Sequence, residues 1–206
     1  IDKHFTVQYR THYEQTPDEM ISKEQKESWG AKLRRKNLGF TRLEILDGNV
    51  GIMEFSGFVD LNTNTKQHIK NIMSFFEGVD ALIIDLRGNG GGSGETVAWL
   101  SSYFVKGKIH LNSFYTRSSD HHQHMWTNTR ISNVHFEDLP LYILTGPKTF
   151  SAAEEFAYNF KHLQRATIVG EASKGGANPW RWFNLPDGFR IGVPTTEAIN
   201  PITKSN

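Results

Sequence analysis

The amino-acid sequence predicts one α/β domain with a β-rich beginning. Two stretches, residues 81–104 and 139–163, each carry an apolar run of strand length, a turn, and then apolar residues at helical spacing. Strand-like segments separated by turn residues lie around residues 48 and 187, and both predict hairpins. A length of 206 residues suits one ordinary domain or two small ones, and 14 Phe, 6 Tyr and 5 Trp supply the core that a disordered chain lacks.

Composition excludes several classes of protein. The 23 basic and 22 acidic residues leave a net charge of +1, so a generic binder of nucleic acid or of anionic membranes is excluded. The chain has no cysteine and therefore no disulfide framework, thiolate metal site or cysteine nucleophile. Its longest apolar stretches, such as residues 81–84, are too short to span a bilayer.

The first strands are predicted from alternation and from one turn. Residues 1–10 alternate apolar and polar side chains, as a short half-buried strand does. Residues 11–36 are polar, and although Thr16 could begin a helix, we favour a solvated connector there. Strands at residues 40–46 and 50–55 flank Asp47-Gly48-Asn49, where Gly and Asn tolerate the positive φ of a hairpin turn.

The rest of the chain alternates strands and helices. A helix at residues 65–77 is predicted because Ile69, Ile72, Met73 and Phe76 recur at intervals of three and four. An apolar strand follows, and a glycine-rich loop then leads into a second helix. The later predicted elements are a strand at 81–86, a helix at 95–104, a strand at 139–145, a helix at 151–163, a strand at 166–170, and strands at 180–185 and 189–193 around Pro186-Asp187-Gly188.

The ends and the change of pattern suggest how the chain is organised. We expect residues 1–49 to form a partial N-terminal subdomain with a connector, and residues 50–206 to form the main domain. The chain opens at Ile1 without a signal-like segment and stops at Asn206 within a predicted turn. We therefore expect a piece of a longer protein.

The glycine loop at residues 87–94 is the first candidate for chemistry. Glycines between a buried strand and a helix leave backbone N–H groups available to an anion. A dinucleotide fingerprint starting at Gly88 would need a third glycine where Ser93 stands, and no phosphate-loop lysine occurs between Arg87 and Lys106. Two interpretations remain, a cradle for a small anion such as a reaction oxyanion, or a tight turn that permits close packing.

Ser151 is the second candidate. It stands between a predicted strand and a predicted helix, where the Ala152 N–H points toward the same side as the serine hydroxyl. Ser151-Ala152-Ala153-Glu154 is also a well-formed capping box, in which the serine would cap the helix. Residue types alone leave a nucleophile and a cap both open.

Three motifs taken in order give a resemblance to a known family. They are Asp85-Leu86-Arg87-Gly88-Asn89-Gly90-Gly91-Gly92, Thr149-Phe150-Ser151-Ala152-Ala153-Glu154 and Gly170-Glu171-Ala172-Ser173-Lys174-Gly175-Gly176-Ala177. Together they resemble the tail-specific, or C-terminal processing, serine peptidases, a family that includes the tricorn core and the modules of interphotoreceptor retinoid-binding protein. The resemblance runs from about residue 51 to residue 206, with a weaker similarity at Asp2-Lys3-His4-Phe5. The third motif is closer to the tricorn-like and retinoid-binding-protein-like branch.

The resemblance implies a fold and a site. The fold would be the crotonase/ClpP-like arrangement of repeated ββα units. Ser151 would be the nucleophile, and Gly90 or Gly91 together with the Ala152 amide would form the oxyanion hole. The substrate would be a peptide or protein bound in extended form along a strand, with no cofactor or metal, and the location would be extracytoplasmic.

The resemblance offers two positions for the general base. In the processing peptidases proper a lysine follows the nucleophile by twenty-five positions, a position that is Gly176 here, and Lys174 lies two residues before it. In the tricorn-like branch a histidine occupies the position of Glu54. We predict Lys174 as the base and Glu54 as the alternative, and a residue beyond Asn206 could also complete the site.

Other features have simpler interpretations. Asp120-His121-His122-Gln123-His124 lacks zinc-motif spacing and predicts a polar loop. Trp180, Trp182 and Phe183 either line an apolar pocket or pack on a sheet. Asp85 and Arg87 are expected to pair and fix the glycine loop, and Glu171 to anchor its own loop. Two further functions stay open, a non-catalytic module for a retinoid-like apolar ligand, and an esterase that uses the same serine.

Overall fold

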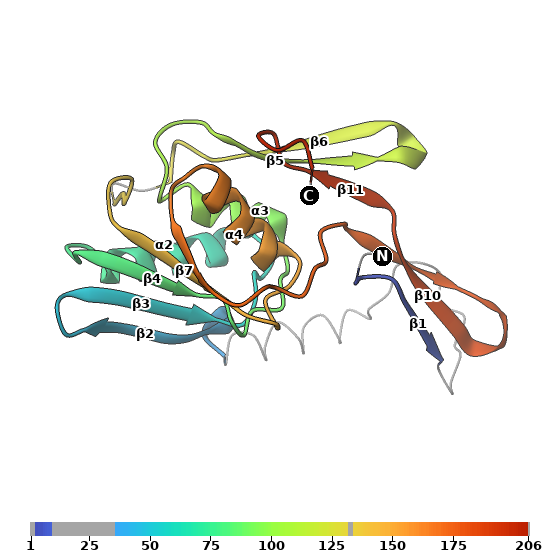
Figure 1. Cartoon of the computed structure of the whole chain (residues 1–206), viewed down its shortest axis with the longest axis horizontal. Coiled ribbons are helices and arrows are strands. Elements are labelled where there is room, and N and C mark those ends of the chain that lie inside the picture. The colour runs from blue at the N-terminus through green and yellow to red at the C-terminus, as the bar shows by residue number, and fades with distance from the viewer. Residues whose placement is uncertain (1–2, 10–35, 132–133, 206) are drawn as a thin grey trace.

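A five-stranded sheet forms the centre of the computed structural model, which describes residues 3–9, 36–131 and 134–205 (Figure 1). β2 (Phe40–Leu46) pairs antiparallel with β3 (Val50–Phe55), and β3, β4 (Ala81–Asp85), β7 (Leu141–Thr145) and β8 (Thr167–Gly170) run parallel to one another. In spatial order the strands are β2, β3, β4, β7 and β8.

Three helices connect these strands: α2 (Thr63–Phe75), α3 (Gly94–Ser101) and α4 (Ala152–His162). Their apolar faces and the central strands share one buried cluster, which includes Met73, Ile84, Val97, Ile143 and Phe156. Ile84 and Ile143 of the inner strands are fully buried, whereas Tyr142 of β7 and Val169 of β8 are exposed.

A second sheet lies on the far side of α3 and α4 from the central sheet (Figure 1). It consists of β11 (Thr196–Ile199), β5 (His110–Thr116) and β6 (His121–Trp126), all antiparallel. Ala98 of α3 packs there against Leu111 and Met125 in a smaller apolar cluster. This sheet was not predicted: the expected polar loop around His122 is wrong, because these residues form strand β6.

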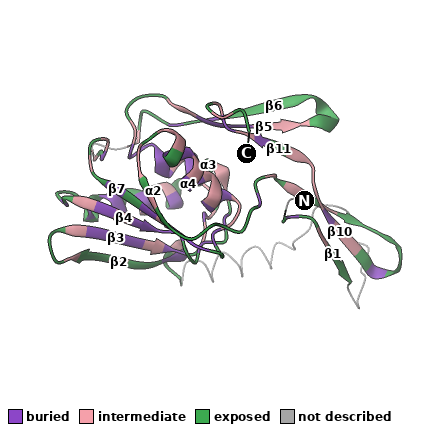
Figure 2. Ribbon diagram, in the orientation of Figure 1, coloured by how far each residue is buried: buried purple, intermediate pink, exposed green. Residues whose placement is uncertain are grey.

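A third sheet joins the two ends of the described chain. β1 (Thr6–Tyr9) pairs antiparallel with β10 (Phe189–Pro194), which pairs with β9 (Trp180–Asn184). Many of its side chains are exposed (Figure 2). The predicted antiparallel pairing of residues 180–185 with 189–193 is confirmed, with the short 3-10 turn Pro186–Gly188 between the strands.

The turn of the β2–β3 hairpin is also confirmed, with Gly48 at φ 80° and Asn49 at φ 58°. A domain boundary after residue 49 would fall within this hairpin. Most of the predicted connector at residues 11–36 lies outside the described residues. Two further 3-10 turns, Asn37–Gly39 and Arg117–Ser119, precede β2 and β6.

Candidate active site

Ser151 occupies a sharp turn at the start of α4. Its backbone has φ 56° and ψ −122°, a conformation that a residue with a side chain rarely adopts. Such strain persists where the surrounding structure requires it, and a sharp turn between strand and helix is the setting that exposes a nucleophilic serine. Glu154 Oε2 accepts a hydrogen bond from the Ser151 N–H at 2.7 Å, which is the glutamate half of the predicted capping box.

The glycine loop lies directly against this turn. A Cβ added to Gly91 would stand 2.7 Å from Ser151 Cβ and 3.0 Å from the Ala152 nitrogen, and Gly91 has φ +94°. The Phe150 N–H donates to the Asn89 carbonyl at 3.1 Å. Only glycine fits at residue 91, so this position brings the first motif into contact with the second.

The backbone N–H groups near Ser151 differ in their availability. Gly90 donates to the Ser56 carbonyl at 3.1 Å, and Gly91 donates to Asn89 Oδ1 at 2.9 Å. Of the predicted oxyanion donors, the two glycine N–H groups are therefore occupied in this conformation, Gly90 by the Ser56 carbonyl and Gly91 by the Asn89 side chain, which closes a local turn. Within the described part of the chain, the Ala152 and Gly92 N–H groups have no protein acceptor.

Glu154 connects the third motif to the serine. Besides Ser151, its carboxylate accepts from the Gly175 N–H at 2.6 Å and from the Gly176 N–H at 2.9 Å. The Lys174 N–H donates to the Thr149 carbonyl at 3.0 Å. One carboxylate thus holds three backbone amides, and all three sequence motifs meet around Ser151. Glu171 anchors its loop through its backbone, which hydrogen-bonds with Thr145.

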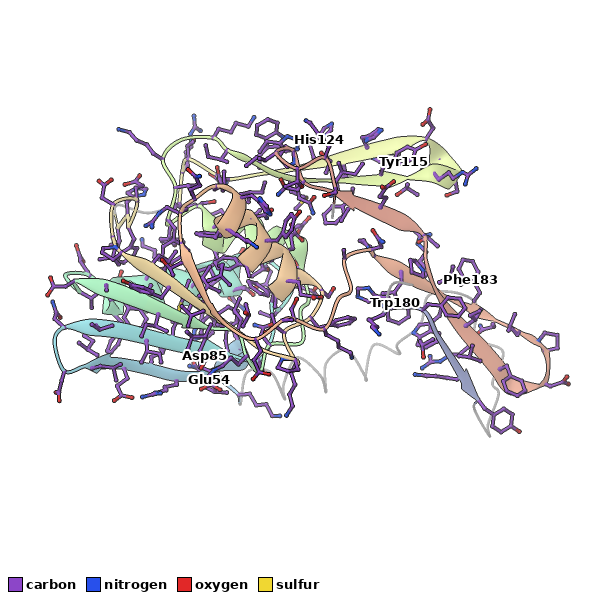
Figure 3. The ribbon with its side chains drawn as sticks, in the orientation of Figure 1. Glu54, Asp85, Tyr115, His124, Trp180 and Phe183 are labelled. Carbon is purple, nitrogen blue, oxygen red and sulfur yellow. The ribbon has the colours of Figure 1, made fainter. Side chains whose placement is uncertain are left out.

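The two predicted bases occupy different surroundings. The Lys174 ammonium lies 4.5 Å from the centre of the Phe150 ring. Phe150 is the residue directly before Ser151 in sequence. Glu54 lies beside Asp85 at the ends of neighbouring strands (Figure 3). Its negative charge contributes to a raised pKa of Arg87, after the hydrogen bond and charge of Asp85.

The predicted pair of Asp85 and Arg87 is present. Arg87 donates from Nη2 to Asp85 Oδ2 at 2.6 Å and from Nε to both carboxylate oxygens. Burial acts to raise the pKa of Asp85, but hydrogen bonds and charge from Arg87 outweigh it and lower the pKa below its usual value. The pair fixes the strand end from which the glycine loop begins.

His4 is a further candidate for the general base, and no contiguous motif indicated it. Its side chain is buried, and its ring centre lies 4.5 Å from that of Phe150 and 6.3 Å from that of Trp180. Its Cε1 would be 3.0 Å from a Cβ on Gly176. The only signal for it was the weak similarity at residues 2–5, because no local spacing connects His4 to Ser151.

A cavity of about 660 Å³ opens beside Ser151. Residues of α4, the loop after β8, and strands β5 and β11 line it, and they include Glu155, Asn159 and Asn112. Trp180, Trp182 and Phe183 do not belong to this lining. Trp180 and Trp182 pack edge to face with ring centres 4.7 Å apart, Arg190 covers Trp182 at 3.8 Å, and Phe183 is exposed (Figure 3). Their contacts are those of sheet packing, which gives no support to a retinoid-like binding module.

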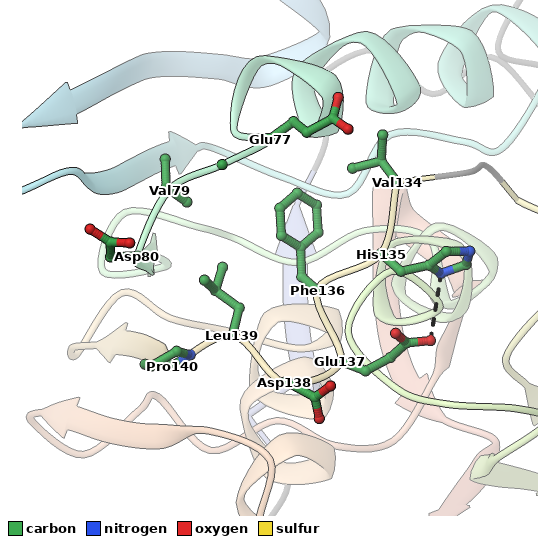
Figure 4. Close-up of a pocket in the computed structure, with 11 residues that line it drawn as sticks. Glu77, Val79, Asp80, Val134, His135, Phe136, Glu137, Asp138, Leu139 and Pro140 are labelled. Atoms are coloured by element: carbon green, nitrogen blue, oxygen red, sulfur yellow. Dashed lines mark ion pairs between the residues drawn. The ribbon is translucent and has the colours of Figure 1, made fainter.

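A second cavity, of about 480 Å³, lies between the end of α2 and residues 134–140 (Figure 4). Carboxylates of Glu77, Asp80, Glu137 and Asp138 line it, and His135 Nδ1 lies 3.7 Å from Glu137 Oε1. No residue of the three motifs reaches it. Across residues 3–9, 36–131 and 134–205, no three His, Cys, Asp or Glu side chains are arranged to hold a metal ion. None of the helices described has the length and apolar composition needed to cross a bilayer.

Comparisons with known proteins agree with these motifs. A carboxyl-terminal-processing protease from Synechocystis sp. is 29% identical over 160 residues, which cover 74% of this chain and 34% of that protein. The chain therefore spans about a third of the length of this relative.

Solved structures show the same fold. A candidate peptidase from Parabacteroides merdae matches with a TM-score of 0.70 at 19% identity, over 100% of this chain and 67% of that one. A lipoprotein from Streptococcus agalactiae matches with a TM-score of 0.62 at 19% identity, over 97% of this chain and 66% of that one. The photosystem II D1 C-terminal processing protease matches with a TM-score of 0.58 at 22% identity, over 79% of this chain and 41% of that one.

The sequence match to the family is the decisive one. It extends over residues 49–205, which is more than half of the chain, and it includes all three motifs. This match confirms the resemblance seen in the sequence, and the chain belongs to peptidase family S41.

Proposed function

We propose that this chain carries the catalytic serine of a peptidase and hydrolyses peptide bonds through Ser151. The observation that carries the proposal is the meeting of three distant motifs around one strained serine with an available neighbouring N–H group. Ser151 Oγ attacks the peptide carbonyl carbon, the amine leaves with a proton, and water then hydrolyses the acyl-enzyme.

The oxyanion is held by the N–H groups of Ala152 and Gly92. The Gly91 carbonyl accepts from the Phe58 N–H at 2.8 Å. A trans peptide directs its C=O and N–H to opposite sides, so the Gly92 N–H faces away from Phe58. Gly91, the residue before Gly92, lies directly against Ser151. Two amides of this kind lower the energy of the tetrahedral intermediate.

We assign the general base to His4, and we retain Lys174 as the competing candidate. Both side chains contact Phe150, the residue before the nucleophile. An imidazole is the most common general base and accepts a proton at neutral pH, whereas an ammonium must first lose one. His4 is also buried, while Lys174 is exposed.

Several finer features follow the family resemblance. The substrate is an extended peptide or protein segment that pairs with a strand edge. The parallel part of the central sheet corresponds to crotonase/ClpP-like repeated units, and the location is extracytoplasmic. The activity of the longer protein is part of this proposal, because the chain covers only part of its relatives.

A fluorophosphonate probe tests the nucleophile. The probe should label the wild-type chain and should not label Ser151→Ala, while Ser119→Ala, which changes an exposed serine of another segment, should label normally. Folded wild-type protein that never reacts would contradict the proposal and would favour a binding module. Peptides should be cleaved, and hydrolysis of esters with no cleavage of peptides would favour an esterase.

The base is tested with two matched variants. His4→Gln should reduce both labelling and peptide cleavage by about 100-fold or more, because general-base catalysis contributes roughly that much. Lys174→Met retains the apolar stem beside Phe150 and should leave most of the activity. If Lys174→Met loses more activity than His4→Gln, Lys174 is the general base.

A further inference from the structure

The cavity beside Ser151 contains a buried carboxylate that the proposed chemistry does not use. Glu155 follows Glu154 on α4, and both line the cavity together with Ser151. Glu155 Oε1 is buried and has no hydrogen-bond partner in the structure. A buried acceptor without a partner is costly, so such a group is usually explained by a ligand or a special role.

Asn112 and Asn159 are polar neighbours of Glu155 in the cavity, and hydrogen bonds from their side chains act to lower its pKa. Asn159 Oδ1 accepts from Asn200 Nδ2 at 3.0 Å, and Asn112 Oδ1 accepts from the Ser113 N–H at 2.9 Å. Asn159 Nδ2 is buried without a partner as well. The asparagines are thus held in place by other contacts, and they form a polar end to the cavity around Glu155.

Charge in the cavity favours a cation. Among the described residues that line it, the acidic groups are Glu154, Glu155 and Glu171, the single basic group is Lys161, and Tyr158 adds a phenol. Glu154 is already paired with three backbone amides. Glu155 is therefore the carboxylate best able to accept hydrogen bonds from an entering group.

We propose that this cavity receives a basic side chain of the substrate, next to the bond that is cut, and that Glu155 accepts hydrogen bonds from its ammonium or guanidinium group. The inference rests on the proposed function, because a peptide held at Ser151 brings a neighbouring side chain to the cavity. Glu155 is a specificity residue in this scheme and takes no part in bond cleavage.

The proton balance gives the scheme a dependence on pH. Burial raises the pKa of Glu155 to about 7, while the side chains of Asn112 and Asn159 act to lower it. A basic side chain favours the carboxylate form, so its entry near neutral pH releases a proton from Glu155. The preference for a basic residue should therefore strengthen as the pH rises through 7.

The test measures how tightly peptides bind to a variant that cannot cleave them. Fluorescence anisotropy with Ser151→Ala compares blocked alanine pentapeptides that carry one lysine or one norleucine at each position in turn. At one position, lysine should bind at least about tenfold more tightly than norleucine at pH 8, as a hydrogen-bonded charge in a buried site allows. The ratio should shrink at pH 6.

A second substitution identifies the responsible carboxylate. Glu155→Gln in the Ser151→Ala background preserves size and should abolish the lysine preference. Glu171→Gln removes an equal charge from an exposed position on the same cavity and should retain most of it. Equal binding of the two peptides at pH 8, or a preference that survives in Glu155→Gln, would overturn the inference.

The two proposals fail in different ways. Failure of the wild type to react with the fluorophosphonate would contradict the proposal that Ser151 is a nucleophile. The anisotropy experiment measures binding alone and therefore tests the role of Glu155 separately. If circular dichroism shows that the Glu155→Gln variant does not fold, the pH dependence of peptide binding to the Ser151→Ala protein tests the role of Glu155 instead. A lysine preference of the same size at pH 6 and pH 8 would then refute the role of Glu155.

Discussion

Replacing Glu155 by glutamine should remove a pH-dependent cost of folding. An exposed glutamate in the unfolded chain has its usual pKa of 4.5, and burial raises the pKa to about 7 in the folded protein. Between these two values the folded state binds more protons than the unfolded state, so stability falls as the pH rises. Below pH 4.5 both states are protonated and the cost is absent.

The size of the effect follows from the two pKa values. Each pH unit between them corresponds to 1.36 kcal/mol, so the full cost above pH 7 is about 3 kcal/mol. Glutamine has nearly the same shape and no charge. The variant should therefore gain stability relative to the wild type as the pH rises, by up to about 3 kcal/mol at pH 8. For a chain of this size that corresponds to an increase of about 6 to 12 °C in Tm.

Urea unfolding at pH 5, 6, 7 and 8 measures this difference. The wild type and Glu171→Gln should share one pH profile, because Glu171 is exposed. The profile of Glu155→Gln should separate from them progressively with rising pH. Parallel profiles for all three proteins, or a variant that becomes relatively less stable at pH 8, would refute the reasoning about Glu155.

Two other predictions test the contacts around Ser151. Gly91→Ala should destabilise the fold by about 3 kcal/mol and abolish fluorophosphonate labelling, because its Cβ would overlap Ser151 and Phe150 at a positive φ. Gly107→Ala, also at positive φ but with no atom within 4 Å of the new Cβ, should cost about 1 kcal/mol and retain labelling, and equal losses would contradict the packing argument. Glu154→Gln should cost about 1.5 to 3 kcal/mol and speed amide hydrogen exchange at Gly175 and Gly176, whereas Glu137→Gln should not; unchanged exchange would show that Glu154 does not hold the loop.

Local signals predicted the central part of the fold well. The turn at Asp47-Gly48-Asn49 and the apolar run of β4 depend on neighbouring residues alone, and both were placed correctly. Strands β5 and β6 were missed because polar and aromatic residues mix along them. Rings stack across this hairpin, as in Tyr115 with His122, and such contacts appear only once the strands pair.

The candidate site was predictable where a motif is contiguous in sequence. Ser151, the glycine loop and the loop after β8 were all identified, because each forms its own turn. The occupied N–H groups of Gly90 and Gly91 could not be foreseen, since they depend on Ser56 and on the rotamer of Asn89. His4 reaches the site through long-range pairing of β1 with β10, which no local pattern encodes.

That pairing also sets the order of events during synthesis. Thr6 is opposite Gly192, and Tyr9 is opposite Phe189, so the first described strand has no partner until residues 189–192 have been made. At ordinary translation rates β10 is made about 10 to 40 s after β1. The nucleophile, its glycine loop and the central sheet can assemble during that interval without His4. In a nascent chain built in this way, the proposed base arrives only after the nucleophile and its glycine loop have formed.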